Sequence, residues 1–204
     1  MKNLPENLIP AQHGGKQNNL EHVETFSSWQ EANDAFEKAV ERLFNVNEWG
    51  DISGFASANF TLTDAAGNTC MRPVREGDYL RISLPAPGLA AGNGFDWVKV
   101  EKIMKEMRAG ETEAFAGFRV RSCANPQNDA SETAHFFTDD ATSTFMVRRA
   151  LMKVIASYHG RNEKINTDTE NMADKIRNAV VGAGALAGIS ELQWTSLIKS
   201  FLKR

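Results

Sequence analysis

The chain has little of several features that would identify its class at once. It contains two cysteines, Cys70 and Cys123, which are too far apart for a metal-binding motif, and with no export signal we expect two reduced thiols. The N-terminus lacks the apolar core and small-residue cleavage site of a secretory signal. The longest nearly apolar run, residues 179–189, is too short to cross a bilayer. We therefore expect a cytoplasmic protein that does not enter a membrane.

An excess of charge of one sign is also missing. The 23 basic residues are balanced by 26 acidic ones, for a net charge of −3. Such a chain has no basic surface for nucleic acid or for an anionic membrane. What it does have is a 42% hydrophobic and 24% charged composition over 204 residues, which is typical of one folded domain with a sizeable core.

The N-terminal part divides into two segments. Residues 1–21 combine prolines, a Gly-Gly pair and polar residues, and we expect them to be a poorly ordered lead-in to a single α+β domain at 22–204. Ser28 and Glu31 have the spacing of a capping box, which predicts a helix over 28–44. Its apolar stripe consists of Trp29, Ala32, Phe36, Val40, Leu43 and Phe44.

From about residue 55 to residue 159 the hydrophobic period changes from helical to two. Segments such as 57–63 and 80–84 alternate apolar with polar side chains, and turn residues separate one segment from the next. No helical pattern lies between them, so the strands follow one another as hairpins. The sequence therefore predicts a single antiparallel, curved sheet of six or seven strands.

Two helices are predicted at the C-terminus. Thr167 and Glu170 form a second capping box for a helix at 168–186, whose apolar face includes Ile176. Ser190 and Gln193 begin the last helix. The core face of that helix comprises Trp194, Leu197, Ile198 and Phe201.

This order of a short strand, a helix, a long antiparallel run and a C-terminal helix resembles the helix-grip fold of START-type lipid- and ligand-binding proteins. The resemblance lies in the order of elements, and the last helix is additional to the pattern. It implies a cavity between the curved sheet and the helix at 168–186.

The most informative stretch runs from residue 135 to residue 163, where two strands are expected. Unlike polar groups gather at the strand ends, which is where a sheet positions binding residues. Trp97 lies at an element boundary and, like Trp49, is a candidate pocket wall, with Phe118, Phe145 and Tyr158 as further apolar candidates. We expect the polar groups to converge on one concavity. The candidate ligand-binding residues are His135, Arg148, His159, Arg161, Glu163 and Trp97.

Other chemistries lack their motifs. His135, His159 and nearby carboxylates do not have the spacing of a metal site on one element. No Gly-x-Ser-x-Gly elbow marks a nucleophile, and the glycine-rich loop at 85–94 has neither the P-loop lysine nor a helix behind it. We therefore expect no metal and no cofactor. Arg119 and Arg121 share one strand face and suit an anion, although pairing with Glu101 on a solvated face is the simpler interpretation.

Two classes of function remain from the sequence. The first is a non-catalytic protein that binds a small, partly apolar ligand, either neutral or anionic, between sheet and helix. The second is a hydrolase or lyase that uses His135 or His159 as a general base, because histidine titrates near neutral pH. A protein-interaction module that docks through its helical end is a third interpretation. The sequence decides neither catalysis nor the oligomeric state.

Overall fold

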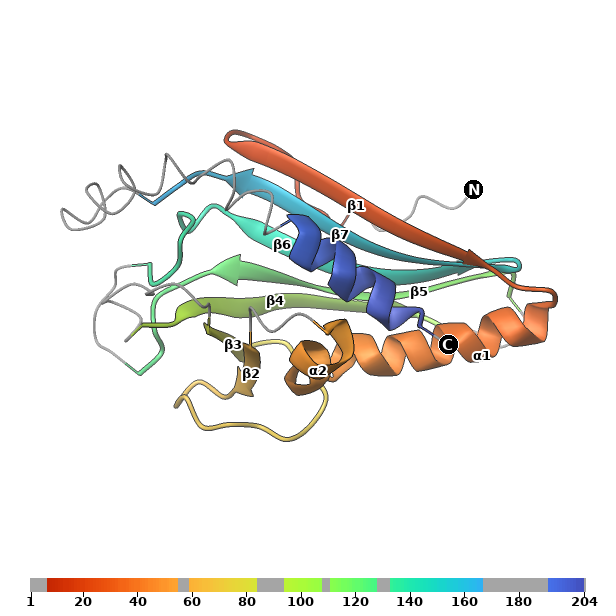
Figure 1. Ribbon diagram of the computed structural model, residues 1–204. Coiled ribbons are helices and arrows are strands. Elements are labelled where there is room, and N and C mark those ends of the chain that lie inside the picture. Colours follow the sequence, from red (N-terminus) through yellow and green to blue (C-terminus); the bar gives the residue numbers. More distant parts are fainter. Residues whose placement is uncertain are drawn as a thin grey trace.

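The fold is a curved antiparallel sheet with helices on one face (Figure 1). The computed structural model describes residues 7–54, 59–83, 94–107, 111–127, 133–166 and 191–203. Seven strands follow the order β1-β7-β6-β5-β4-β3-β2, and all neighbouring pairs are antiparallel, as predicted. The elements are β1 (Lys16–Thr25), α1 (Trp29–Phe44), the 3-10 helix η1 (Val46–Glu48), α2 (Trp49–Ser53), β2 (Asn59–Thr63), β3 (Tyr79–Ser83), β4 (Asp96–Glu106), β5 (Glu113–Ser122), β6 (Thr142–Ala150), β7 (Lys153–Glu163) and a C-terminal helix at 191–201.

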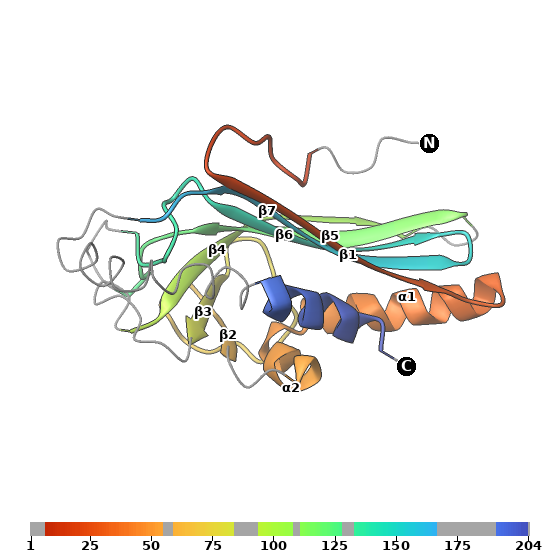
Figure 2. The ribbon, with the colours of Figure 1, turned by 45° about the horizontal axis from the view of Figure 1, so that its top comes forward.

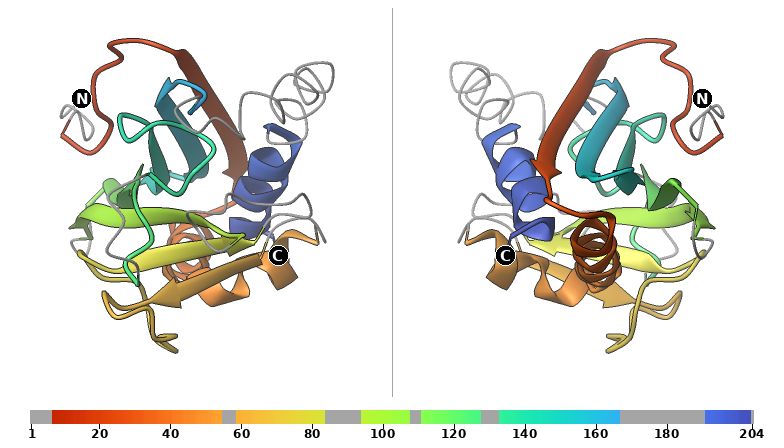
Figure 3. Two further views of the ribbon diagram at one scale, coloured as in Figure 1. Left: turned by 90° about the vertical axis from the view of Figure 1, so that its left-hand side faces the viewer. Right: turned by 90° about the vertical axis from the view of Figure 1, so that its right-hand side faces the viewer.

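The sheet curls around its helices. The described helices α1, α2 and the C-terminal helix all lie on the same side of the strands (Figure 2). Seen from either end, the strands arc around α1 and the C-terminal helix (Figure 3). The helix-covered side is called the concave face below, and the other side the convex face. A strand, a helix and a long antiparallel run thus follow one another in the predicted order, and the last helix, at 191–201, packs on the concave face.

Helix α1 forms as the capping residues predict. The Ser28 hydroxyl accepts a hydrogen bond from the Glu31 amide at 3.2 Å, and the Glu31 carboxylate accepts one from the Ser27 amide at 3.0 Å. These bonds satisfy two amides that have no partner inside the helix. The predicted stripe packs against the sheet, and its buried members are Ala32, Phe36, Val40, Leu43 and Phe44.

Aromatic side chains fill the centre of the space between sheet and helices. Trp49 is fully buried, and its ring centroid lies 4.8 Å from that of Phe145 on the sheet and 5.6 Å from that of Phe201 on the C-terminal helix. Phe118 and Phe60 complete the contact around it. The proposed role of Trp49 as a pocket wall is therefore corrected, because this side chain is the middle of the core.

The N-terminal region is more ordered than the sequence predicts. Strand β1 begins at Lys16 and pairs with β7 along its length, although its first residues are polar. Strand pairing uses backbone groups, so an edge strand can form without an apolar pattern. Residues 7–15 precede it, and Leu8 among them is fully buried. Strand β1 thus begins before residue 22, where the domain was expected to start.

Two expectations concern the region after β5. Strand β6 begins at Thr142, so His135 lies in the preceding loop and not on the strand as expected. The helix expected at 168–186, with Ile176, lies outside the described residues. In the last helix Leu197, Ile198 and Phe201 are buried as predicted. Within the described part of the chain, no helix has the length and hydropathy needed to span a bilayer.

The first prediction concerns Phe36, which is 1% exposed in the core. Replacing Phe36 by alanine should lower the free energy of unfolding by about 3–5 kcal/mol, because it removes buried apolar area and leaves a cavity. Urea denaturation measures the loss. Gln30, on the exposed face of the same helix, provides the control, because Gln30→Ala should change stability by less than about 0.5 kcal/mol. Equal effects of the two changes would contradict the packing of α1.

The second prediction concerns the two cysteines, which are not bonded to each other. Burial raises the pKa of the Cys123 thiol to about 12. Because the thiolate is the reactive form, Cys123 should react with Ellman's reagent at pH 8 far more slowly than Cys70 in the native protein. Both should react in denaturant without reductant. Finding no free thiol in denaturant would contradict the expectation of two reduced thiols.

Candidate functional site

The six residues predicted to bind a ligand do not meet in one place. Val154, Ala156 and Tyr158 on β7 lie in the core on the concave face. Side chains alternate along a strand, so His159, the residue after Tyr158, faces the convex side. His135, in contrast, lines a cavity together with concave residues such as Val98. The expected convergence of His135 and His159 is therefore corrected, although ligand binding by each remains a prediction.

His159 is held by neighbours on the convex face. Its Nδ1 lies 2.9 Å from Oδ1 of Asn19 on β1, and its Nε2 lies 3.1 Å from the Ser157 hydroxyl. Arg161 donates to the same Asn19 oxygen at 2.8 Å, so that oxygen is the acceptor and His159 Nδ1 carries the hydrogen. Burial, helped by the charge of Arg161, lowers the pKa of His159 to about 4. Both residues thus join β1 to β7.

Trp97 and Arg148 lie elsewhere on the same convex side. Trp97 alternates with the core residue Val98 and is 1% exposed, so it is buried outside the main core. On β6, Arg148 lies opposite Ile155, whereas Thr142 lies opposite Arg161. Arg148 is thus six positions along the strand from the end of the sheet where Arg161 lies. At the usual rise per residue this separation is roughly 20 Å. Arg148 is therefore remote from the other candidates at this end of the sheet, whereas Trp97 lies near His135 in the chain path, since its amide donates to the Ala134 carbonyl at 2.8 Å, but its side chain faces the convex side. Ligand binding by either residue stays a prediction.

Glu163 does reach the concave face, because the alternation of β7 is reversed beside it. Asn162 has a φ of 56°, in the left-handed region that few residues other than glycine adopt. The register with β1 shifts at this point, with Lys16 opposite Glu163 but Asn18 opposite Gly160. Strand β7 thus has one residue more than β1 here, which is a β-bulge. The reversal directs the Glu163 carboxylate toward the side chain of Tyr158.

A chain of hydrogen bonds then crosses the concave face. The Tyr158 hydroxyl donates to Glu163 Oε1 at 3.1 Å, and it lies 3.2 Å from the Ser143 hydroxyl on β6. The carboxylate occupies the space above Gly160, where any Cβ would collide with it. Burial raises the pKa of both Tyr158 and Glu163 above their ordinary values. The Tyr158 ring stacks on Trp194 of the C-terminal helix, with centroids 4.9 Å apart.

A second pair of polar groups lies at the same end of the sheet. His135 Nε2 is 4.0 Å from a carboxylate oxygen of Asp96, and both side chains are largely buried, at 14% and 7% exposed. Burial lowers the pKa of His135 and raises that of Asp96, so burial favours the neutral form of each. His135 Nδ1 accepts a hydrogen bond from the Phe137 amide at 3.0 Å. The neutral ring therefore carries its hydrogen on Nε2, facing Asp96.

His135 and Glu163 both line one small cavity of about 10 Å³, which is about the volume that a single water probe requires. Thr142 lines it too, but its strand partners Arg121 and Arg161 lie on the convex face, so its side chain points away from Glu163. The polar side chains that converge on the cavity from the concave face are therefore those of Glu163 and Ser143, with His135 beside them. The cavity is lined by Val98, Val120, Ser122, His135, Phe137, Ala141, Thr142, Ser143 and Glu163.

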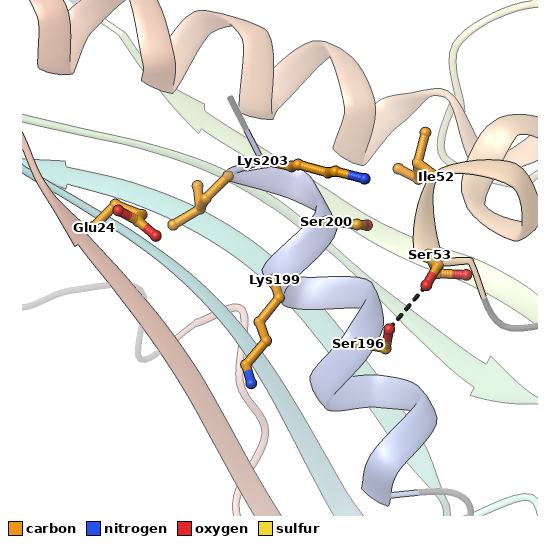
Figure 4. Close-up of a pocket in the computed structure, with 8 residues that line it drawn as sticks. Glu24, Ile52, Ser53, Ser196, Lys199, Ser200 and Lys203 are labelled. Atoms are coloured by element: carbon orange, nitrogen blue, oxygen red, sulfur yellow. Dashed lines mark hydrogen bonds between the residues drawn. The ribbon is translucent and has the colours of Figure 1, made fainter.

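A larger groove, of about 420 Å³, lies where the C-terminal helix meets α2 and the end of β1 (Figure 4). Its hydroxyls are engaged in the helix packing, since Ser196 donates to the Ser53 carbonyl at 2.9 Å and Ser200 to the Leu197 carbonyl at 2.6 Å. The side chains of Lys199 and Lys203 extend in different directions. A ligand is oriented by convergent polar groups, which this groove lacks, so we favour the smaller cavity as the candidate polar anchor.

The small cavity offers hydrogen-bond acceptors and a neutral imidazole, without a cationic group among its lining residues. Arg119 and Arg121 lie on the convex face and bond to Glu101, as the simpler interpretation of the sequence predicts. In the described ranges, no cluster of three or more histidine, cysteine, aspartate or glutamate side chains could hold a metal ion. The site is therefore suited to hold a ligand that donates hydrogen bonds.

Sequence reasoning named Glu163 and His135 but missed Asp96, and it listed Tyr158 only as an apolar wall. One signal was present. Gly160 stands inside an otherwise good strand, which often marks a bulge or a close approach of another group. The missed residue looks like an ordinary strand residue, and only the pairing of the strands brings it to the site.

Comparisons with known proteins add no functional assignment. No protein-family model matches the chain, and no curated protein matches it. Similar solved structures include Ara h 8.0201, which is 9% identical over 93% of this chain and 100% of that one, with a TM-score of 0.38. A norcoclaurine synthase point mutant from Thalictrum flavum is 10% identical over 92% of this chain and 98% of that one, with a TM-score of 0.34. The major latex-like protein 151 from Panax ginseng is 11% identical over 92% of this chain and 97% of that one, with a TM-score of 0.35. At such identities and TM-scores, function has to be argued from the site.

The third prediction concerns His159. Its pKa of about 4 in the folded chain is below the ordinary 6.5, so as the pH falls the unfolded chain takes up the proton first. The contribution of His159 to stability is thus fully present above pH 6.5 and is lost between pH 6.5 and pH 4. Each pKa unit corresponds to about 1.4 kcal/mol.

Histidine resonances followed by NMR should show His159 titrating near pH 4. In unfolding experiments at pH 7 and pH 4.5, His159→Gln should reduce the loss of stability on acidification, because glutamine takes up no proton. A midpoint of about 6.5 for His159 would contradict its burial against Asn19 and Ser157.

Proposed function

We propose that the protein binds a small, partly apolar molecule between the concave face of the sheet and its helical cover, with no chemical step. The molecule places one hydroxyl or amino group in the cavity beside Glu163. The observation that carries this proposal is the Glu163 carboxylate, which the backbone reversal at Asn162 brings to a cavity on the concave face, beside Ser143 and His135. Binding sites combine apolar walls with a few convergent polar groups, and this cavity has both.

The charge of the site decides between ligand classes. Arg119 and Arg121, which suggested an anion, lie on the convex face and bond to Glu101. An anionic group in the cavity would be buried next to the Glu163 carboxyl group, with no cationic side chain in the cavity lining, which is costly. A hydrogen-bond donor, neutral or cationic, can instead bond to Glu163. We therefore propose a donor-bearing ligand in place of an anionic one.

A general base is less well supported by this geometry. The two ring nitrogens of His159 are occupied by Asn19 and Ser157. The lone pair of His135 is occupied by the Phe137 amide, and its N–H is directed toward Asp96. A base must offer a free lone pair to the proton that it removes. Binding thus fits the arrangement of these two histidines better than hydrolysis or lyase chemistry does.

The fourth prediction compares three probes that share a benzene ring: benzyl alcohol, benzylamine and benzoate. Binding is measured at pH 7 from amide chemical-shift changes in the full chain. Benzyl alcohol and benzylamine should shift the amides around Ser143 and Glu163 in a saturable way. Benzoate should bind roughly tenfold more weakly or not at all, because its charge would be buried without a partner. Tighter binding of benzoate than of both other probes would contradict the proposal.

Variants locate the site. Glu163→Leu keeps a similar volume but removes both oxygens, so benzyl alcohol should bind roughly tenfold more weakly, which is the typical effect of losing a hydrogen bond to a charged group. Ser196→Ala removes a hydroxyl from the larger groove and serves as the matched control, with no effect expected. The reverse pattern would move the site to the groove in Figure 4.

A further inference from the structure

Residues 7–15 form a strap on the convex face, and this N-terminal strap contacts the sheet at two points. The first is Leu8, whose side chain is fully buried. A Cβ added to Gly117 on β5 would lie 2.9 Å from Leu8 Cδ2, so the strap packs closely over this glycine. The Leu8 carbonyl also accepts a hydrogen bond from Arg119 at 3.2 Å. The strap is therefore a packed part of the fold.

The second contact is Asn162, the residue with left-handed backbone on β7. Its side-chain oxygen accepts hydrogen bonds from the amides of His13 at 2.7 Å and Gly14 at 3.3 Å, and its side-chain nitrogen donates to the Ala11 carbonyl at 3.3 Å. Its own amide donates to the Gln12 side chain at 2.9 Å. All polar groups of the Asn162 side chain are thus bonded to the strap.

Asn162 and Glu163 are consecutive, and they point to opposite faces of the sheet. If β7 continued its alternation from Tyr158, Asn162 would face the concave side and Glu163 the convex side. The observed arrangement is the reverse, with Asn162 bonded to the strap and Glu163 bonded to Tyr158. The strap contacts thus offset the cost of the left-handed backbone that brings Glu163 into the cavity.

We propose that the N-terminal strap positions Glu163 through Asn162, so that docking of the strap on the convex face and ligand binding on the concave face are coupled. Asn162 is a positioning residue, because it touches the strap and not the cavity. The ligand part of this proposal rests on the proposed function, whereas the positioning of Glu163 does not. Coupling between two sites is reciprocal. A change that releases the strap therefore lowers the affinity for the ligand, and ligand binding stabilises the docked strap.

The first experiment needs no ligand. The carboxyl carbon of Glu163 is titrated by NMR in the full chain. Four titratable or charged groups bear on that carboxylate: Tyr158 donates a hydrogen bond to it, His135 lines the same cavity, and the positive charges of Lys16 and Arg161 act on it through space. Burial raises its pKa, so release into solvent should lower the midpoint toward that of an ordinary glutamate.

Asn162→Ala removes both the strap bonds and the tolerance for a left-handed backbone, and it should lower the Glu163 midpoint. Asn162→Asp keeps an acceptor oxygen for His13 and Gly14 and should retain most of the wild-type value. An unchanged midpoint in Asn162→Ala would overturn the proposal.

A second pair of variants tests the strap itself and controls for stability. Leu8→Ala should loosen the strap and lower the Glu163 midpoint. Leu62→Ala is the matched control, because Leu62 is also fully buried but lies on β2, at the opposite edge of the sheet. It should destabilise the fold without moving that midpoint. Equal midpoint changes in the two variants would overturn the proposal, since general loosening would then explain both.

The ligand experiment separates this proposal from the proposed function. Benzyl alcohol should bind several-fold more weakly to Leu8→Ala, within the roughly 5–150-fold range of typical couplings, and should slow hydrogen exchange of the His13 and Gly14 amides by a similar factor. If no probe binds but the Glu163 midpoint still follows Asn162, the positioning stands and the proposed function fails. If the probes bind with equal affinity to Leu8→Ala and the wild type, the coupling is overturned while the proposed function stands.

Discussion

The left-handed backbone at Asn162 is the constraint on which the candidate site depends. In a regular strand, side-chain direction follows from position alone, so one carboxylate cannot change faces unless the backbone changes with it. At Asn162 the β-bulge makes that change, and Glu163 moves from the arginine-rich convex face to the neutral, mostly apolar concave one. The hydrogen bond that Glu163 accepts from Tyr158, and the raised pKa of Glu163, are consequences of this single reversal.

The aromatic core sets the size of what can bind. Trp49 at its centre contacts Phe118 and Phe145 of the sheet and Phe201 of the C-terminal helix. These side chains fill the middle of the space between sheet and helices, and they leave the polar cluster at the end of the sheet where β6 begins and β7 ends. A sheet that curls around helices does not by itself provide a large ligand cavity. The side chains between sheet and helices determine how much space remains for a ligand. Here they leave room for a small polar anchoring group beside apolar walls.

Most of the fold could be predicted from the sequence, because it follows from local patterns. The capping box at Ser28 and the stripe through Phe36 predicted α1, and the period of two predicted the antiparallel sheet. The N-terminal strap and the first half of β1 could not be predicted, because their polar residues are ordered by backbone pairing with β7 and by Asn162. The rule of alternation likewise gave no reason to separate His159 from Glu163. That separation depends on a φ value set by residues about 150 positions away in the chain.

The central claim, that the Glu163 carboxylate above Gly160 anchors a ligand, is tested most directly by Gly160→Ala. The added methyl group would occupy the place of the carboxylate, whereas the backbone at Gly160 is one that alanine can adopt. The decisive measurement is the dissociation constant of benzyl alcohol for this variant, with the native fold checked by its amide spectrum. The account predicts a folded protein that binds the probe roughly tenfold more weakly or not at all. A folded variant with wild-type affinity would contradict it.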